Sequence, residues 1–181
     1  MSDVPVLITD RLRLRQLTVD DADALFPTLS DADLMTWWSS APHESVEQTR
    51  AYFAPRVERE GWRCWAITLA DDDIAIGWVA AGEKRQGKVT EIGYILARDH
   101  WGSGIAAEAV SAVIDRLFDE GQRRVFADTD PENTASLALL ERLGFRREGY
   151  LRAEWETHIG VRDSVILGLL KDEWRSARGE A

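Results

Sequence analysis

VTEIGYILARDHWGSGIAAEA, residues 89–109, is the stretch of sequence that decides the fold. Its first part is rich in β-branched and aromatic side chains, which predicts a strand over Val89–Leu96. A polar turn and a pair of glycines follow, and apolar residues then recur at every fourth position from Ile105 to Leu117. This spacing predicts an amphipathic helix that packs against a sheet, with Gly121 as its C-terminal stop.

The two glycines stand directly before this helix. A helix N-terminus offers unpaired N–H groups and a partial positive charge, and glycine lets phosphate oxygens approach the backbone. The loop Trp101-Gly102-Ser103-Gly104-Ile105-Ala106 is therefore predicted to bind a pyrophosphate, which any side chain at Gly104 would obstruct. The chain contains no Gly-x-x-x-x-Gly-Lys-Ser/Thr sequence, which excludes a P-loop nucleotide site.

The same glycines also fit a second fingerprint. Gly102-x-Gly104-x-x-Ala107 matches the dinucleotide-binding pattern, and Asp128 stands about where a ribose-binding acid is expected. In that fold the glycine loop follows its strand at once, whereas residues 97–101 intervene here. Too few elements remain after the helix to complete a doubly wound sheet, so this interpretation is the weaker one.

Outside this stretch, hydrophobic periodicity, caps and turn residues predict one α/β domain over residues 1–181, without repeats or linkers. Several neighbouring strands are joined by short turns, so a mixed sheet is favoured over an all-parallel one. Pro55 is predicted to kink or stop, near Ala54, the helix that opens at Ser45. The other expected segments are strands at 11–15, 64–69, 74–81, 124–128, 150–153 and 161–170, and helices at 20–30, 31–37 and between Pro131 and Leu143.

The composition limits the partners. The formal net charge of −10 repels a phosphate backbone, so no nucleic acid is expected, whereas a cationic substrate would be attracted. The alternative is that the acidity serves solubility alone. No run approaches the ~20 apolar residues of a membrane span, and the chain does not open on a signal peptide. No membrane partner and a cytoplasmic location are therefore expected.

Cysteine and histidine usage excludes two further classes. Cys64 is the only cysteine, which rules out an internal disulfide and fits a reducing compartment. His43, His100 and His158 are scattered without metal-ligand spacing, so no metal is expected. We interpret the three histidines as surface groups.

Several blocks of the sequence resemble one family. Glu91-Ile92-Gly93-Tyr94-Ile95-Leu96, followed by Trp101–Ala109, resembles the acetyl-CoA motif of the GNAT superfamily of N-acetyltransferases. Asp130-Pro131-Glu132-Asn133-Thr134-Ala135-Ser136, with Glu141–Phe145 after it, looks like the next block of that family, so the motif would span about residues 89–145. The opening Thr9–Arg15 and the closing residues 160–174 are similar to the RimJ/RimL branch, the ribosomal-protein-alanine N-acetyltransferases and their relatives. The resemblance covers nearly the whole chain.

The resemblance implies a single-domain GNAT-like fold, α/β (α+β), with a mixed, mostly antiparallel sheet that is splayed in the middle and flanked by helices. Acetyl-CoA would be the co-substrate, and its pantetheine arm would pair with backbone groups near Ile95, Leu96 and Ala97. The family usually has Gln or Arg at the position of Trp101, although the branch often carries Trp, so the loop would rely on backbone N–H groups. Asn133 would bind the pantetheine or position Ser136; alternatively, it is merely a helix N-cap.

The resemblance also suggests roles in the reaction. The carbonyl oxygen needs a donor, expected to be a backbone N–H near Ile95 or Leu96 and worth ~3 kcal/mol. Glu91 is the candidate base, acting through a water, and the alternative is that it is an ordinary solvated strand residue. Ser136 is the candidate acid for the departing coenzyme A, because Leu140 stands where many members of the family have a tyrosine.

The acceptor is the least determined part. Trp37, Trp38 and Tyr94 are the candidates to line its pocket, and a core or lid role is the alternative for each tryptophan. Arg162 and Asp163 are interpreted as a structural pair in the last strand. The predicted function is acetyl transfer to a primary amine, either a protein or peptide N-terminus or a small molecule such as an antibiotic, polyamine or amino acid. A non-catalytic acetyl-CoA-binding domain is a further alternative, and the family makes a homodimer through the C-terminal strands conceivable.

Overall fold

A mixed sheet forms the centre of the molecule, in a computed structural model that describes residues 4–85 and 87–179. Every neighbouring pair of strands is antiparallel except β5 and β6, which run parallel, so the predicted mixed and mostly antiparallel sheet is confirmed. In the order β1-β2-β3-β4-β5-β6-β8-β7, the strands are β1 (Leu7–Ile8), β2 (Leu12–Gln16), β3 (Trp62–Leu69), β4 (Gly77–Arg85), β5 (Val89–Leu96), β6 (Arg124–Thr129), β8 (Gly160–Leu170) and β7 (Arg146–Thr157).

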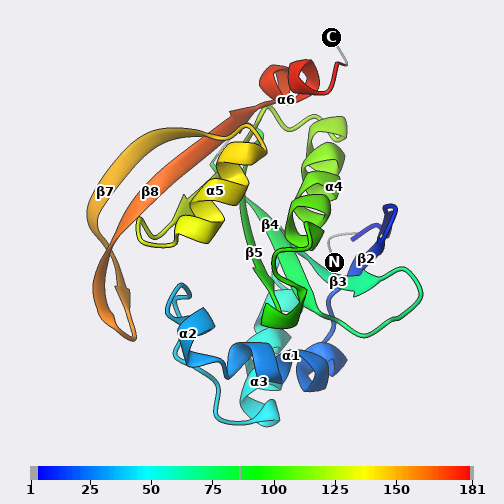
Figure 1. The fold of residues 1–181 in the computed structure, drawn as a ribbon, viewed down its shortest axis with the longest axis vertical. Helices are drawn as coiled ribbons and strands as arrows, with labels where there is room; N and C mark the ends of the chain where they lie inside the picture. The colour runs from blue at the N-terminus through cyan, green and yellow to red at the C-terminus, as the bar shows by residue number, and fades with distance from the viewer. Residues whose placement is uncertain (1–3, 86, 180–181) are drawn as a thin grey trace.

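Helices cover the sheet (Figure 1). They are α1 (Ala22–Leu29), α2 (Ala32–Met35), α3 (Val46–Val57), α4 (Ile105–Asp119), α5 (Thr134–Arg142) and α6 (Lys171–Ala177), with short 3₁₀ turns η1 (Val19–Asp21) and η2 (Arg98–His100). Within the described residues, no helix combines the length and the apolar character needed to cross a membrane.

The alternation of side chains along each strand divides the core between the two faces of the sheet. On β3, Trp65 and Ile67 belong to the cluster that includes the buried stripe of α4, whereas Cys64 and Ala66 belong to the cluster of α1 and α3. Successive side chains of a strand point to opposite faces, so one strand serves both layers. The predicted helix over 105–118 is confirmed, and Gly121 follows it with a φ of +90°.

The sheet parts between β5 and β6. Their pairing is confined to Val89↔Arg124, Thr90↔Val125 and Glu91↔Phe126, although β5 continues to Leu96. On its other edge β6 pairs with β8 over its whole length, and β7 and β8 form a long curved hairpin away from β4 and β5 (Figure 1). The open half of β5 is the splay that the resemblance implied.

Some local predictions were wrong. Of the kink or stop predicted at Pro55, the stop at Ala54 does not occur: α3 runs through Pro55 to Val57, because a proline removes only the hydrogen bond of its own N–H. β4 begins at Gly77 rather than Ile74, and β7 is far longer than 150–153. The prediction also lacked β1 and α6.

His43 is a buried residue, contrary to our expectation of a surface group. Its side chain is 4% exposed, and its Nδ1 lies 2.8 Å from the hydroxyl oxygen of Thr49. The ring packs edge-on against Tyr52 with the centroids 5.0 Å apart. Burial, with the nearby charge of Arg56, lowers the pKa of His43 below its ordinary value.

Candidate active site

The glycine loop leads into an α4 that has no side-chain cap. Gly102 and Gly104 have φ values of +72° and +81°, a left-handed conformation that favours glycine. Gly104 is the N-cap residue, and no side chain caps the helix there. The exposed residues 101–104 precede it, so the first N–H groups of α4 face solvent or a ligand. This geometry suits a pyrophosphate, since even a Cβ on either glycine would lie where the backbone must be approached.

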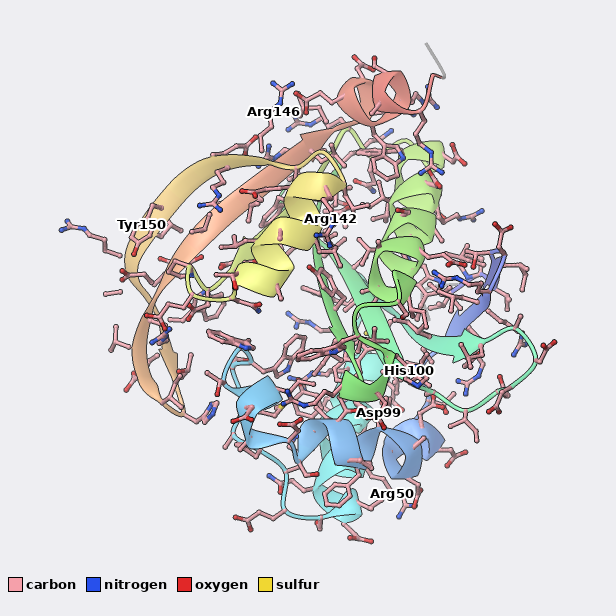
Figure 2. All side chains as sticks on the ribbon, in the orientation of Figure 1. Arg50, Asp99, His100, Arg142, Arg146 and Tyr150 are labelled. Carbon is pink, nitrogen blue, oxygen red and sulfur yellow. The ribbon has the colours of Figure 1, made fainter. Side chains whose placement is uncertain are left out.

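Trp101 ties the loop back to the end of β5. Its indole Nε1 donates a hydrogen bond of 2.7 Å to the carbonyl oxygen of Leu96, and its ring lies under the guanidinium of Arg98. Ser103 donates from its hydroxyl to the carbonyl oxygen of His100 over 2.6 Å. Figure 2 labels His100 and Asp99 at this turn between β5 and α4. The Trp101 side chain therefore fixes the loop, and the carbonyl of Leu96 is engaged by it.

Sequence reasoning missed Arg11 at this loop. Its guanidinium donates to the carbonyl oxygen of Ser103 over 2.9 Å and forms an ion pair of 2.6 Å with Glu108, in the first turn of α4. The backbone N–H of Arg11 and the hydroxyl of Thr9 donate to the same carboxylate. In the sequence, Thr9 and Arg11 belong only to the block that resembles the family's opening. Because 97 positions separate Arg11 from Glu108, no local pattern predicts their contact.

The backbone N–H and C=O groups of β5 point alternately toward β4 and toward β6. The N–H of Ala97 donates to the carbonyl oxygen of Ile76, whereas the carbonyl oxygen of Lys88 accepts from Arg123, toward β6. Hydrogen-bonding groups of a strand point alternately to its two neighbours, and no register shift interrupts β5 after residue 89. The backbone groups of Ile95 and Ala97 therefore face β4, and the N–H groups of Tyr94 and Leu96 face the opening.

Two hydroxyls meet on the α5 side of that opening. The phenol oxygen of Tyr94 lies 2.7 Å from the Oγ of Ser136, and either atom can be the donor. Burial raises the pKa of Tyr94 to about 12, against the opposing effect of the hydrogen bond with Ser136, so the phenol keeps its proton at neutral pH. Asn133 caps α5 by accepting from the N–H of Ser136 over 3.1 Å, so the capping alternative for Asn133 is realised.

Tyr94 does not line the cavity that contains Trp37 and Trp38, described below. It packs partly buried against the core cluster of α4 and α5. Leu140 is fully buried in that cluster. The hydroxyl that lies beside Ser136 therefore comes from β5 and not from α5.

A cavity of about 210 Å³ opens on the other side of β5, where α2 ends. Trp37 and Trp38 line it, together with Glu91 and Gly93, so the structure brings three of the predicted residues together. Trp38 is fixed by a 2.6 Å hydrogen bond from its Nε1 to the hydroxyl of Tyr52. The carboxylate of Glu91 is 19% exposed and forms an ion pair of 3.1 Å with the ammonium of Lys84.

The opposite wall of the cavity consists of residues that sequence reasoning did not place there. They are Asp128 and Asp130 at the end of β6, Trp155 and Thr157 on β7, and Arg162 and Asp163 on β8. Arg162 pairs with Asp130 over 2.7 Å and with Glu132, not with Asp163. Hydrogen bonds from the hydroxyl of Tyr150 and the N–H of Ala153 lower the pKa of Asp163 below its ordinary value, so it is ionised at neutral pH.

A larger hollow of about 520 Å³ lies elsewhere, between β1 and α4. It contains none of the predicted site residues, so its size alone does not mark a site. Among residues 4–85 and 87–179, no group of three or more His, Cys, Asp or Glu side chains could hold a metal ion.

Comparison with known proteins identifies the family. The family described as "Acetyltransferase (GNAT) domain" matches residues 11–146. The uncharacterized N-acetyltransferase p20 of Bacillus licheniformis is 34% identical over 93% of this chain and 97% of its own length. The uncharacterized N-acetyltransferase YoaA of Bacillus subtilis is 36% identical over 82% of this chain and 86% of its own. A GCN5-related N-acetyltransferase from Brucella melitensis has the same fold, with a TM-score of 0.88 at 23% identity over 98% of this chain and 83% of that one.

The RimJ/RimL branch matches more distantly. The [ribosomal protein uS5]-alanine N-acetyltransferase of Escherichia coli is 34% identical over 48% of this chain and 45% of its own length. A RimL ribosomal L7/L12 α-N-protein acetyltransferase, solved in complex with coenzyme A, shares the fold with a TM-score of 0.80 at 20% identity, over 93% of this chain and 99% of that one. The fuller matches are the Bacillus N-acetyltransferases. The chain is an N-acetyltransferase of the GNAT family.

Proposed function

We propose that this protein transfers an acetyl group from acetyl-CoA to a cationic primary amine, by direct attack of the amine on the thioester. One observation carries the proposal: β5 parts from β6 between two features that suit the two substrates. The uncapped N-terminus of α4 lies at the end of β5, and the tryptophan-lined cavity lies on the opposite face. A two-substrate transfer requires such adjacent sites.

The residues present fit acetyl-CoA. Gly102 and Gly104 leave the α4 backbone open to a pyrophosphate, and the N–H groups of Tyr94 and Leu96 face the opening, as a pantetheine arm requires. When bound, acetyl-CoA supplies an acetyl thioester. A backbone N–H of this part of β5 would donate to the thioester oxygen, and Ser136, hydrogen-bonded to Tyr94, would protonate the departing sulfur.

The acceptor we favour is a peptide N-terminus. The RimL and uS5-alanine enzymes act on ribosomal proteins, according to their names. An α-amine has a pKa of ~8, against ~10.4 for lysine, so it needs little help to become neutral. The cavity has the chemistry of a cation site, since Asp128, Asp163 and three indoles line it.

A small amine is the second candidate. The cavity of about 210 Å³ is of the size of a small molecule rather than of a long peptide. A spermidine N-acetyltransferase from Vibrio cholerae shares the fold, with a TM-score of 0.79. A homodimer through the C-terminal strands stays a prediction; the exposed Ile159 and Val161 of that hairpin are compatible with it.

The deciding experiment is an acceptor screen with purified protein and acetyl-CoA, read by thiol release and by mass spectrometry of the products. We expect acetylation of peptides with a free N-terminus, and loss of the signal when that terminus is blocked. Turnover of diamines or amino acids alone would select the small-molecule alternative. Acetyl-CoA binding with no turnover on any amine would select the non-catalytic one.

A further inference from the structure

Two carboxylates from neighbouring strands line the acceptor cavity, Glu91 on β5 and Asp128 on β6. β5 and β6 pair as far as Glu91 and Phe126 and then part. Asp128 lies two residues beyond Phe126, so it stands just past the point where the sheet opens. Ser136, the candidate acid, lies in the first turn of α5, the helix that follows the same strand.

The two carboxylates differ in their partners. Glu91 is paired with the ammonium of Lys84 at 3.1 Å. The Glu91 carboxylate is therefore already engaged by a cation, which an acceptor amine would have to displace. Asp128 instead accepts from two neutral donors, the indole Nε1 of Trp155 over 3.0 Å and the hydroxyl of Ser164. Neither of these two partners is a cation.

Arg162, the basic residue that lines the cavity, already has acidic partners. Arg162 divides its guanidinium between Asp130, at 2.7 Å, and Glu132, at 2.7 Å. Asp128 is therefore the cavity carboxylate of β6 whose charge no arginine or lysine offsets among the pairs found in the described residues.

Three strands hold Asp128 in place. The carboxylate comes from β6, the indole that binds it comes from β7, and the hydroxyl comes from β8. Trp155 is 42% exposed and also lines the cavity, so one side chain both orients Asp128 and borders the space for the acceptor. A proton acceptor must be held in a fixed position beside the reacting nitrogen, and hydrogen bonds from two sides fix the Asp128 carboxylate at the cavity wall.

We propose that Asp128, rather than Glu91, is the catalytic residue that accepts the proton of the acceptor amine. This inference rests on the acetyl transfer proposed above. As the amine nitrogen forms its bond to the acetyl carbon, one N–H proton passes to a carboxylate oxygen of Asp128. The carbon–sulfur bond breaks with its electron pair on sulfur. The sulfur then takes up a proton from Ser136, which recovers one from solvent, and Asp128 releases its own to solvent. From the neutral amine no proton is gained or lost overall, and a protonated amine releases one further proton to solvent before it attacks.

The test compares substitutions of three carboxylates, each measured with the same acceptor for kcat, KM and acetyl-CoA affinity. Asp128→Asn should lower kcat at least a hundredfold, within the ~10²–10⁴-fold range of proton-transfer catalysis, with acetyl-CoA affinity unchanged in calorimetry. Glu91→Gln should lower kcat less than tenfold. Asp163→Asn removes the same charge from the same cavity and should raise KM for a cationic acceptor while kcat changes little.

Each result has a consequence. Asp128→Asn with a kcat within threefold of wild type overturns the inference, and a loss in Glu91→Gln that equals or exceeds it returns the role to Glu91. Equal KM effects in Asp128→Asn and Asp163→Asn, without a kcat effect, would make Asp128 part of the charge of the cavity only. If wild type binds acetyl-CoA but acetylates no amine, the proposed function itself fails, and this inference with it.

A second variant keeps the inference testable if Asp128→Asn does not fold. Asp128→Glu retains the negative charge and moves the carboxylate by one methylene group. A proton acceptor displaced in this way should lose at least tenfold in kcat, since such geometry is held to within ~0.5 Å. Wild-type kcat in a folded Asp128→Glu protein would overturn the assignment.

Discussion

Tyr94 and Ser136 place two hydroxyl groups 2.7 Å apart, although 42 positions separate them in the chain. A phenol with a pKa of about 12 stays protonated at neutral pH and can donate to the serine oxygen. That bond leaves the proton of Ser136 free to point toward the opening of the sheet. Asn133 holds Ser136 from the other side, through its backbone N–H. The hydroxyl groups of Tyr94 and Ser136 are therefore coupled by a hydrogen bond, and a change in one should affect the other.

We expect Ser136→Ala to lower kcat about a hundredfold, at the lower end of the proton-transfer range, because a thiolate of pKa ~8.5 leaves fairly well unassisted. Acetyl-CoA affinity should be nearly unchanged, which is the signature of an interaction made in the transition state. Tyr94→Phe should cause a smaller loss, and the double variant should be no slower than Ser136→Ala alone. Wild-type kcat in Ser136→Ala would mean that water or the acceptor protonates the thiolate.

His43 gives a pH dependence of stability. Its folded pKa is lowered by burial, so at pH below the unfolded value of ~6.5 the unfolded chain binds a proton that the folded chain does not. The contribution is fully present above pH ~6.5 and is lost as the pH falls toward the folded pKa. The free energy of unfolding should decline by less than ~1.4 kcal/mol per pH unit over this window, the limit for one proton.

Urea denaturation between pH ~7 and ~5 measures this decline. His43→Gln, which keeps a hydrogen-bonding group beside Thr49, should remove most of the slope. His158→Gln, at an exposed position of the β7–β8 turn, is the matched control and should retain it. A slope unchanged in His43→Gln would assign the decline to other groups.

At the scale of elements, α4 connects the core to the loop that precedes it. Seven of its residues are buried against the sheet, which fixes its axis. Its N-terminus is held by the ion pair of Arg11 with Glu108 and by the bond from Arg11 to Ser103. The loop is thus anchored by side chains at both ends, with Trp101 bound to Leu96, while its glycine backbone stays exposed. Rigid anchoring of an open backbone suits anion binding.

Gly102→Ala tests the loop with a matched control. Gly102 and Gly61 have φ values of +72° and +76°, and a Cβ at either position would meet no atom within 4 Å. Alanine at each site therefore costs the same backbone strain, ~1 kcal/mol. Calorimetry should show at least a tenfold loss of acetyl-CoA affinity for Gly102→Ala and none for Gly61→Ala. Equal affinities would contradict the pyrophosphate site, and NADH binding by wild type would favour the dinucleotide interpretation.

Valine at Gly104 is a harsher form of the same test. Gly104 is the left-handed N-cap of α4, and a Cβ there would come 3.4 Å from the guanidinium of Arg11. A β-branched side chain in this conformation strains the helix start as well as the loop. The alanine variant therefore separates binding from folding more cleanly.

At the scale of the whole molecule, the negative net charge and the acidic lining of the cavity both attract a cationic acceptor. The whole chain has a net charge of −10, and the cavity is itself lined by more carboxylates than basic groups. Fields of this kind raise the encounter rate of a cationic acceptor. The parting of β5 and β6 places this acidic cavity on one face of the sheet and the opening toward α5 on the other.

The expected outcome is a kcat/KM for a positively charged peptide that falls as salt rises from ~20 to ~300 mM, because the screening length shortens through ~8 Å near 0.15 M. A peptide of the same length with an acidic second residue should show a weaker dependence. Steady-state assays at constant pH measure both. A flat profile for the basic peptide would leave the acidic surface with a role in solubility alone.

The sequence by itself determined what depends on neighbours along the chain. The periodicity of residues 105–118 specified α4, the glycine pair specified its left-handed entry, and Asn133 specified the cap of α5. Each of these features is a local rule of helix geometry, caps or backbone freedom, so it can be predicted without knowledge of the rest of the fold.

Only the tertiary structure decided which side chains meet. A strand exposes alternate residues to opposite faces, so the register and the parting of β5 and β6 put Tyr94 beside Ser136 and left Glu91 in the acceptor cavity. Asp128 gained Trp155 and Ser164 because β8 and β7 follow β6 in the sheet, out of sequence order. Such contacts join residues 27 to 42 positions apart, and no local pattern encodes the crossover that brings them together.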